Sequence, residues 1–166
     1  MATYEATVDS AWTADETFDY LADFSNAEHW DPGVLAGERL DAGAGRVTTG
    51  SSFRLVVPFA GRRMTLVYRV VFISRENREV IFEAENSVLH ARDRIVIRSA
   101  GASGTGCTVT YRADVRMRGL LGPLNPVLGR GFRTVGDRAV KGLVGALADP
   151  AGPDAARVPG GTDRPS

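Results

Sequence analysis

The fold is most clearly indicated by residues 52–85, which read SFRLVVPFAGRRMTLVYRVVFISRENREVIFEAE. Apolar side chains recur at every second position over most of this stretch, as expected of strands that bury one face. Two turn signals interrupt the alternation, one at Ala60-Gly61 and one at Arg75-Glu76-Asn77. The stretch therefore predicts three antiparallel strands joined by hairpins.

The turn positions also predict which residues face one another. A two-residue turn at Ala60-Gly61 brings apolar side chains together, with the pairs Val57 and Met64, Leu55 and Leu66, and Phe53 and Tyr68. The turn at residues 75–77 gives the pairs Phe72 and Val80, and Val70 and Phe82. A shift of one residue would turn a strand inside out, so the agreement of the two hairpins supports both pairings.

Two further hairpins extend the predicted sheet. A turn at Asn86-Ser87 gives the pairs Ala84 and Leu89, Phe82 and Ala91, and Val80 and Asp93. The glycine-rich residues 101–106 return the chain to give Ile97 and Val109, Ile95 and Tyr111, and Asp93 and Ala113. The opposite face carries charged side chains, namely Arg63, Arg69, Glu83, Glu85, Arg92, Arg94, Arg98, Arg112, Arg116 and Arg118. Residues 35–118 therefore predict an antiparallel meander with one face toward water.

Helices are predicted before and after the meander along the chain. Residues 2–11 alternate as a first strand, and Thr13 with Glu16 fits a capping box that begins a short helix. A second helical segment at residues 25–30 is stopped by Asp31-Pro32. Apolar residues at helical spacing from Leu124 to Leu147 then predict one long amphipathic helix, which is long enough to cover the apolar face of the sheet.

Composition limits the possible partners. A chain of 166 residues is expected to form one domain, and 20 basic against 20 acidic residues argue against a nucleic-acid partner. Two histidines and one cysteine cannot supply the usual four-ligand zinc cluster, and neither a metal nor a cofactor is predicted. No signal-like N-terminus and no apolar run of about 18 residues occur, so we expect a cytoplasmic protein without integral membrane association. Residues 1–148 are the predicted domain, and residues 149–166, rich in Pro and Gly, the predicted disordered tail.

Two local stretches support a family resemblance. Residues 13–24, TADETFDYLADF, and residues 26–34, NAEHWDPGV, resemble the first helices and the tryptophan turn of the START-like, or SRPBCC, superfamily. That superfamily includes Bet v 1-type proteins and polyketide cyclase/dehydrase-like proteins. The resemblance implies an α+β helix-grip fold, in which a curved antiparallel sheet wraps around a long C-terminal helix and two short helices follow the first strand. It also implies a cavity between sheet and helix, but no particular reaction, because the scaffold serves lipid carriers, cyclases, hydroxylase subunits and co-chaperone partners.

The inner face of the predicted sheet and the long helix supply candidate ligand-binding residues. These are Trp30, Phe53, Leu55, Leu66, Tyr68, Phe82, Ala91, Asp93, Ile95, Tyr111, Ala113, Phe132 and Val135. The small inner residues Ala84, Ala91 and Ala113 either leave room for a ligand or let the helix approach closely. The helix also contains Gly129, Gly131, Gly136, Gly142 and Gly145, which suit either a movable lid or tight packing.

Asp93 is the unusual member of this set, because a buried carboxylate is costly unless it is hydrogen-bonded or paired. With Tyr111 diagonally across the ladder, it is a candidate general base or an anchor for a ligand hydroxyl. Alternatively it is structural, satisfied by an arginine of the long helix or by water. His90 lies on the opposite face of its strand, which excludes a Ser87–His90–Asp93 triad. His29 either transfers protons at a cavity mouth or is an exposed residue beside a packing Trp30.

The sequence thus favours a protein that binds a hydrophobic small molecule, lipid-like or polyketide-like, in an internal cavity. One alternative is an enzyme of the polyketide cyclase/dehydrase type that uses Asp93 and Tyr111. Another is a protein-interaction module with a solid interior and an unspecified protein partner.

Overall fold

The computed structural model describes residues 1–41, 45–101, 106–119, 125–149 and 152–156, with only the backbone described for residues 125–130, 155 and 156. Seven strands form one antiparallel sheet in the order β1-β7-β6-β5-β4-β3-β2. The elements in chain order are β1 (Ala2–Ser10), α1 (Ala14–Ala22), the 3-10 helix η1 (Phe24–Asn26), α2 (Ala27–Trp30), β2 (Ala36–Arg39), β3 (Ser52–Phe59), β4 (Arg62–Ser74), β5 (Glu79–Glu85), β6 (Leu89–Ser99), β7 (Cys107–Met117), α3 (Asn125–Ala148) and α4 (Pro153–Ala156).

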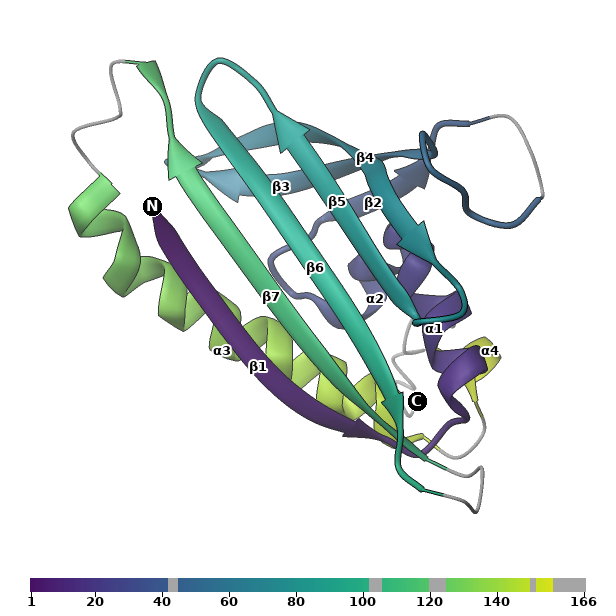
Figure 1. Cartoon of the computed structure of the whole chain (residues 1–166). Coiled ribbons are helices and arrows are strands. Elements are labelled where there is room, and N and C mark those ends of the chain that lie inside the picture. The colour runs from purple at the N-terminus through teal and green to yellow at the C-terminus, as the bar shows by residue number, and fades with distance from the viewer. Residues whose placement is uncertain (42–44, 102–105, 120–124, 150–151, 157–166) are drawn as a thin grey trace, which may run out of the picture.

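The sheet curves around the long helix. Figure 1 shows α3 running alongside β1, and α1 contacts β6 and β7 whereas α2 contacts β2. α3 contacts β1 and α2, and η1 contacts β2 and β3. This arrangement confirms the predicted α+β helix-grip fold.

Local signals explain where the first helices begin and end. The Thr13 hydroxyl accepts a hydrogen bond from the Glu16 N–H, and a Glu16 carboxylate oxygen accepts one from the Thr13 N–H at 3.0 Å, so the predicted capping box is present. The end of α3 is joined to the chain just before α1. The Ala11 N–H donates to the Leu147 carbonyl at 2.9 Å, and the Trp12 indole N–H donates to the Asp149 carbonyl at 2.6 Å.

Two of the predicted hairpins have the predicted register. β3 and β4 pair Phe53 with Tyr68, Leu55 with Leu66 and Val57 with Met64. Ala60 and Gly61 both have positive φ, 49° and 76°, as a two-residue type I′ turn requires. β6 and β7 pair Asp93 with Ala113, Ile95 with Tyr111 and Ile97 with Val109.

The predicted register between β4 and β5 is wrong beyond Val70. Val70 does face Phe82, but the register shifts between Val70 and Phe72, so that Ile73 rather than Phe72 faces Val80. One extra residue on one strand is the signature of a β-bulge. As a result Phe72 faces Ile81 and is 43% exposed instead of joining the core.

The predicted register between β5 and β6 is wrong by two residues. Phe82 faces Asp93, Val80 faces Ile95, and Ala84 faces Ala91. The turn lies one residue later than predicted, at Ser87-Val88, because the Asn86 N–H donates to the Leu89 carbonyl at 3.0 Å and the Asn86 side-chain oxygen accepts hydrogen bonds from the backbone N–H groups of Val88 and Leu89. A shift of two residues keeps every side chain on its predicted face, so the inner face itself is as expected.

Two glycines of α3 permit close packing. A Cβ at Gly136 would lie 2.5 Å from the Tyr4 ring, and a Cβ at Gly142 would overlap the Trp30 carbonyl oxygen. At Gly131 and Gly145 an added Cβ would meet nothing within 4 Å. The tight-packing interpretation therefore holds for Gly136 and Gly142.

Beyond α3, the predicted tail is in part helical. Residues Pro153–Ala156 form the single turn α4, which contacts α1 and α3. Residues 150–151 and 157–166, which belong to the same predicted tail, lie outside the described residues. Among the helices that are described, none combines the length and the apolar character needed to cross a bilayer.

Candidate functional site

A cavity of about 690 Å³ lies between the inner face of the sheet and α3. This volume is within the range of small-molecule binding pockets. Strands β3, β4, β6 and β7 and residues 131–139 of α3 contribute mostly apolar walls, which include Val57, Phe59, Met64, Leu66, Leu89, Ala91, Ala113, Val115, Met117, Phe132, Val135 and Ala139. The interior is therefore not packed solid, as the interaction-module hypothesis supposed.

The structure brings together most of the predicted ligand-binding residues. Those that line the cavity are Leu66, Tyr68, Ala91, Asp93, Tyr111, Ala113, Phe132 and Val135. Ala91 and Ala113 thus leave room in the cavity, whereas Ala84 is buried outside its lining.

The remaining predicted residues are buried but do not line the cavity, and they are Trp30, Phe53, Leu55, Phe82 and Ile95. The reason is that η1 fills part of the inner face. The Phe24 ring of η1 stacks on Phe82, with ring centroids 4.3 Å apart, and meets Tyr68 edge-on at 5.0 Å. Trp30 packs edge-on against Tyr111 at 6.0 Å and so lies behind the cavity wall.

Asp93 is the buried polar group of the cavity wall, with only 4% of its surface exposed. It projects from β6 between the cross-strand neighbours Phe82 and Ala113. The Tyr111 hydroxyl donates a hydrogen bond of 2.5 Å to one carboxylate oxygen of Asp93. A tyrosine of β7, rather than an arginine of α3, therefore holds this carboxylate.

The surroundings of Asp93 raise its pKa toward neutral pH. The pKa of Asp93 is raised to about 6, chiefly by burial; the hydroxyls of Tyr111 and Tyr68 act in the opposite direction, and the negative charges of Asp31 and Asp114 add to the rise. Burial, and then the charge of Asp93, hold the pKa values of Tyr68 and Tyr111 well above that of a free tyrosine. Both tyrosines are therefore neutral hydrogen-bond donors at physiological pH, while Asp93 can exchange a proton there.

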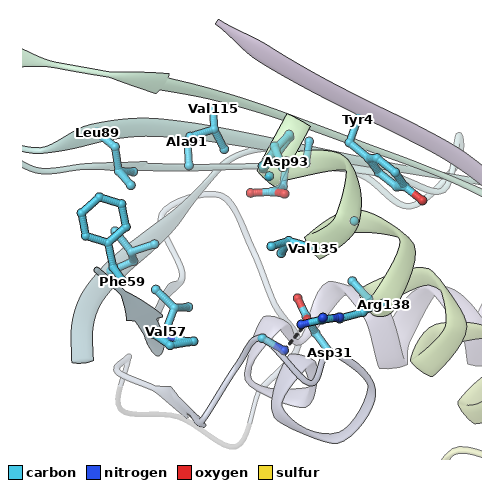
Figure 2. Close-up of a pocket in the computed structure, with 18 of the residues that line it drawn as sticks. Tyr4, Asp31, Val57, Phe59, Leu89, Ala91, Asp93, Val115, Val135 and Arg138 are labelled. Carbon is cyan, nitrogen blue, oxygen red and sulfur yellow. Dashed lines mark hydrogen bonds between the residues drawn. The ribbon is translucent and has the colours of Figure 1, made fainter. Parts of the chain in front are cut away.

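A second carboxylate, Asp31, lies on the facing wall. It follows α2, and one of its oxygens accepts a hydrogen bond of 2.7 Å from the Gly33 N–H. Burial raises the pKa of Asp31, and the Gly33 N–H partly offsets this shift. Figure 2 shows the Asp93 carboxylate pointing from the sheet into the cavity, with Asp31 across from it and Val135 of α3 between them.

Asp31, Tyr4 and Arg138 also line the cavity, although none of them was predicted as a site residue. Asp31 lies in a connection without periodicity, so no alternation pattern could place it. Tyr4 of β1 lines the cavity where its ring lies close to Gly136 of α3.

Neither histidine belongs to the cavity lining. His29 lies in α2, with its Nε2 3.6 Å from a Glu28 carboxylate oxygen. His90 pairs with Glu85 and Arg116 on the face of β6 opposite to that of Asp93, so no triad with Ser87 forms. Within the described ranges, no group of three or more His, Cys, Asp or Glu side chains is placed to hold a metal ion.

Comparison with known proteins agrees with this architecture. The model of a family described as polyketide cyclase/dehydrase and lipid transport matches residues 1–148. A search of curated proteins found no match. Similar solved structures include the ZhuI aromatase/cyclase from Streptomyces sp. R1128, with a TM-score of 0.67, 18% identity, and coverage of 93% of this chain and 92% of that chain.

Two other solved structures extend the comparison. A START superfamily protein from Mycobacterium smegmatis has a TM-score of 0.68 and 17% identity, over 89% of this chain and 97% of that chain. A point mutant of norcoclaurine synthase from Thalictrum flavum, in complex with a transition-state analogue, has a TM-score of 0.56 and 12% identity, over 86% of this chain and 92% of that chain. At such identities the likeness concerns the fold alone.

Proposed function

Because the chain belongs to the polyketide cyclase/dehydrase and lipid transport family, we propose that it binds a hydrophobic small molecule, lipid-like or polyketide-like, in the cavity between the sheet and α3. The observation that carries this proposal is the cavity of about 690 Å³ with mostly apolar walls. Each methylene group that a ligand transfers from water into such a cavity contributes about 0.8 kcal/mol to binding. Apolar contact is therefore the main source of affinity, and the few polar groups orient the ligand.

A neutral, environment-sensitive dye such as Nile red tests this proposal directly. We expect its fluorescence to rise on binding, and we expect lipids and aromatic polyketides to displace it. Native mass spectrometry of protein purified from its source would identify a ligand that co-purifies. If the dye does not bind and no compound shifts the melting temperature, the carrier proposal is wrong.

Two valines of α3 offer a matched pair of variants. Val135 lines the cavity and is 48% exposed, whereas Val144 lies outside the lining and is 45% exposed. A tryptophan at position 135 occupies ligand space, so Val135→Trp should weaken dye binding about tenfold. Val144→Trp adds the same side chain to the same helix and should leave binding unchanged.

A second candidate function is catalysis of the cyclase/dehydrase type, and the Tyr111–Asp93 hydrogen bond at the cavity wall favours it. A carboxylate with a pKa of about 6 is mostly ionised at neutral pH and can accept a proton from a carbon next to a ligand carbonyl. In this case Asp93→Asn should abolish turnover of a poly-β-ketone substrate while the protein remains folded. If Asp93→Asn retains turnover, Asp93 is not the base.

A further inference from the structure

The charge of the cavity lining is one-sided. Asp93 and Asp31 occupy facing walls, and the negative charge of Asp31 raises the pKa of Asp93. Within the described part of the lining, Arg138 is the one basic residue, and its side chain is exposed. An apolar ligand that enters this cavity therefore approaches two carboxylates with little compensating positive charge inside.

The hydrogen bonds of the cavity wall also favour a cationic ligand over an anionic one. The Tyr111 hydroxyl already donates to Asp93, and the Gly33 N–H already donates to Asp31. These donors are not free for an incoming anion. The carboxylates, in contrast, retain acceptor capacity, because each carboxylate has about four lone-pair sites.

Burial decides which ligand head group this arrangement suits. A ligand carboxylate would be desolvated beside like charges, which is strongly unfavourable. A ligand ammonium group would offset the charges of Asp93 and Asp31 and donate charge-assisted hydrogen bonds, which are about twice as strong as neutral ones. A ligand hydroxyl can donate but carries no charge.

We propose that the cavity selects apolar ligands that carry a protonated amine and that Asp93 binds the ammonium group. Ligands with the same apolar body and a carboxylate head group are excluded. This inference rests on the proposed function, since it requires that the cavity bind an apolar molecule. It adds the chemical class of the ligand head group.

Three probes with one apolar body test the proposal on the unaltered protein, namely naphthyl-ethylamine, naphthyl-ethanol and naphthyl-acetate. Titration calorimetry at about pH 7.5, where Asp93 is ionised, should show the amine binding about tenfold more tightly than the alcohol, and the acetate more weakly than both. Equal or tighter binding of the alcohol or the acetate overturns the proposal, as does an amine that fails to bind while Nile red binds. If Nile red fails to bind as well, the proposed function itself is wrong.

Two variants locate the source of the preference. Asp93→Asn should weaken amine binding about tenfold and so remove the preference for the amine over the alcohol. The matched control is Glu83→Gln, which removes one negative charge from the outer face of β5, where Glu83 pairs with Arg92 of β6. An equal loss of amine binding in both variants would mean that net charge, rather than Asp93, attracts the amine, and the proposal would fail.

The pH dependence supplies a readout that does not depend on the folding of any variant. The groups that act on Asp93 are Tyr111, Tyr68, Asp31 and Asp114. At about pH 5 Asp93 is mostly protonated, so the preference for amine over alcohol should fall severalfold in the unaltered protein. An unchanged preference between about pH 7.5 and pH 5 contradicts a role for Asp93 as the partner of the amine.

Discussion

Tyr111 and Asp93 join adjacent strands through a hydrogen bond of 2.5 Å on the wall of the cavity. Asp93 faces Ala113 and Tyr111 faces Ile95, so the bond crosses the ladder diagonally rather than between direct partners. This geometry lets a long side chain on β7 reach a short one on β6 above the small Ala113. The pair is therefore a product of strand register, and its properties can be tested by changing either residue.

Removal of the Tyr111 hydroxyl should raise the pKa of Asp93, because the bond stabilises the ionised carboxylate. We expect Tyr111→Phe to lower the free energy of unfolding by about 1–3 kcal/mol at neutral pH, the usual cost of leaving a buried charged acceptor without its donor. Carbon NMR of the carboxyl groups would measure the pKa, and urea unfolding the stability. Tyr4→Phe is the control, because the Tyr4 hydroxyl bonds to the exposed Asp137; a pKa of Asp93 that does not respond to Tyr111→Phe would contradict this account.

The pKa of Asp93 also predicts how stability depends on pH. Its pKa in the folded protein is about 6, above the ordinary value of 3.8, so between these two pH values the folded state holds a proton that the unfolded state releases. The resulting stabilisation is complete below about pH 4 and is lost as the pH rises through about 6, a change of about 2–3 kcal/mol.

The measurement for that prediction is urea unfolding of the unaltered protein and of Asp93→Asn between about pH 4 and pH 7, compared as a difference. The difference isolates Asp93 from Asp41, whose pKa is lowered chiefly by its hydrogen bond with Arg39 and which therefore has the opposite pH dependence. A difference that does not change with pH would show that Asp93 titrates alike in both states.

Ligand binding should be linked to protons through the same carboxylate. A neutral apolar ligand excludes water from the cavity and raises the pKa of Asp93 further, so it should bind with proton uptake at about pH 6–7. A ligand amine should lower that pKa and bind with proton release near pH 6. Calorimetry in buffers of different ionisation enthalpy reports the sign, and the same sign for both ligand classes would contradict the linkage.

The glycines of α3 should respond to alanine according to their contacts. Gly145→Ala should stabilise the protein by up to about 1 kcal/mol, because alanine favours the helix and meets open space there. Gly142→Ala should be strongly destabilising, since the Trp30 carbonyl is backbone and cannot rotate away. Gly136→Ala should be destabilising through contact with the Tyr4 ring. Urea unfolding of the three variants checks the order, and a neutral Gly142→Ala would refute the close approach of α2 and α3.

The sequence predicted the faces of the strands better than their register. Alternation separates the two faces of a strand, but it cannot separate registers that differ by two residues, and so Phe82 was paired with Ala91 instead of Asp93. The alternation of residues before Val70 likewise does not indicate the β-bulge that follows it. Asp93 and Tyr111 were identified because they lie on strands whose register was predicted correctly.

The extent of the cavity could not be predicted from the strands alone. Phe53, Leu55, Phe82 and Ile95 point inward as predicted, but they pack in the solid part of the interior, where Phe24 of η1 stacks on Phe82. The docking of the short helices decides which half of the inner face is filled. Docking is a matter of tertiary structure, which the alternation within a strand does not show. Asp31 was missed for the same reason, since its place on the cavity wall follows from the docking of α2.

The position of β1 at the edge of the sheet, next to β7, has a consequence for biosynthesis. β1 pairs only with β7 in the sheet order, and its first residue, Ala2, faces Val115. β1 is translated before the other six strands of the sheet and therefore has no partner until β7 has been translated. Closing so long a loop is entropically costly and slows folding, so we expect the hairpins from β3 to β7 to assemble first, with β1 and α3 joining them once α3 has been translated.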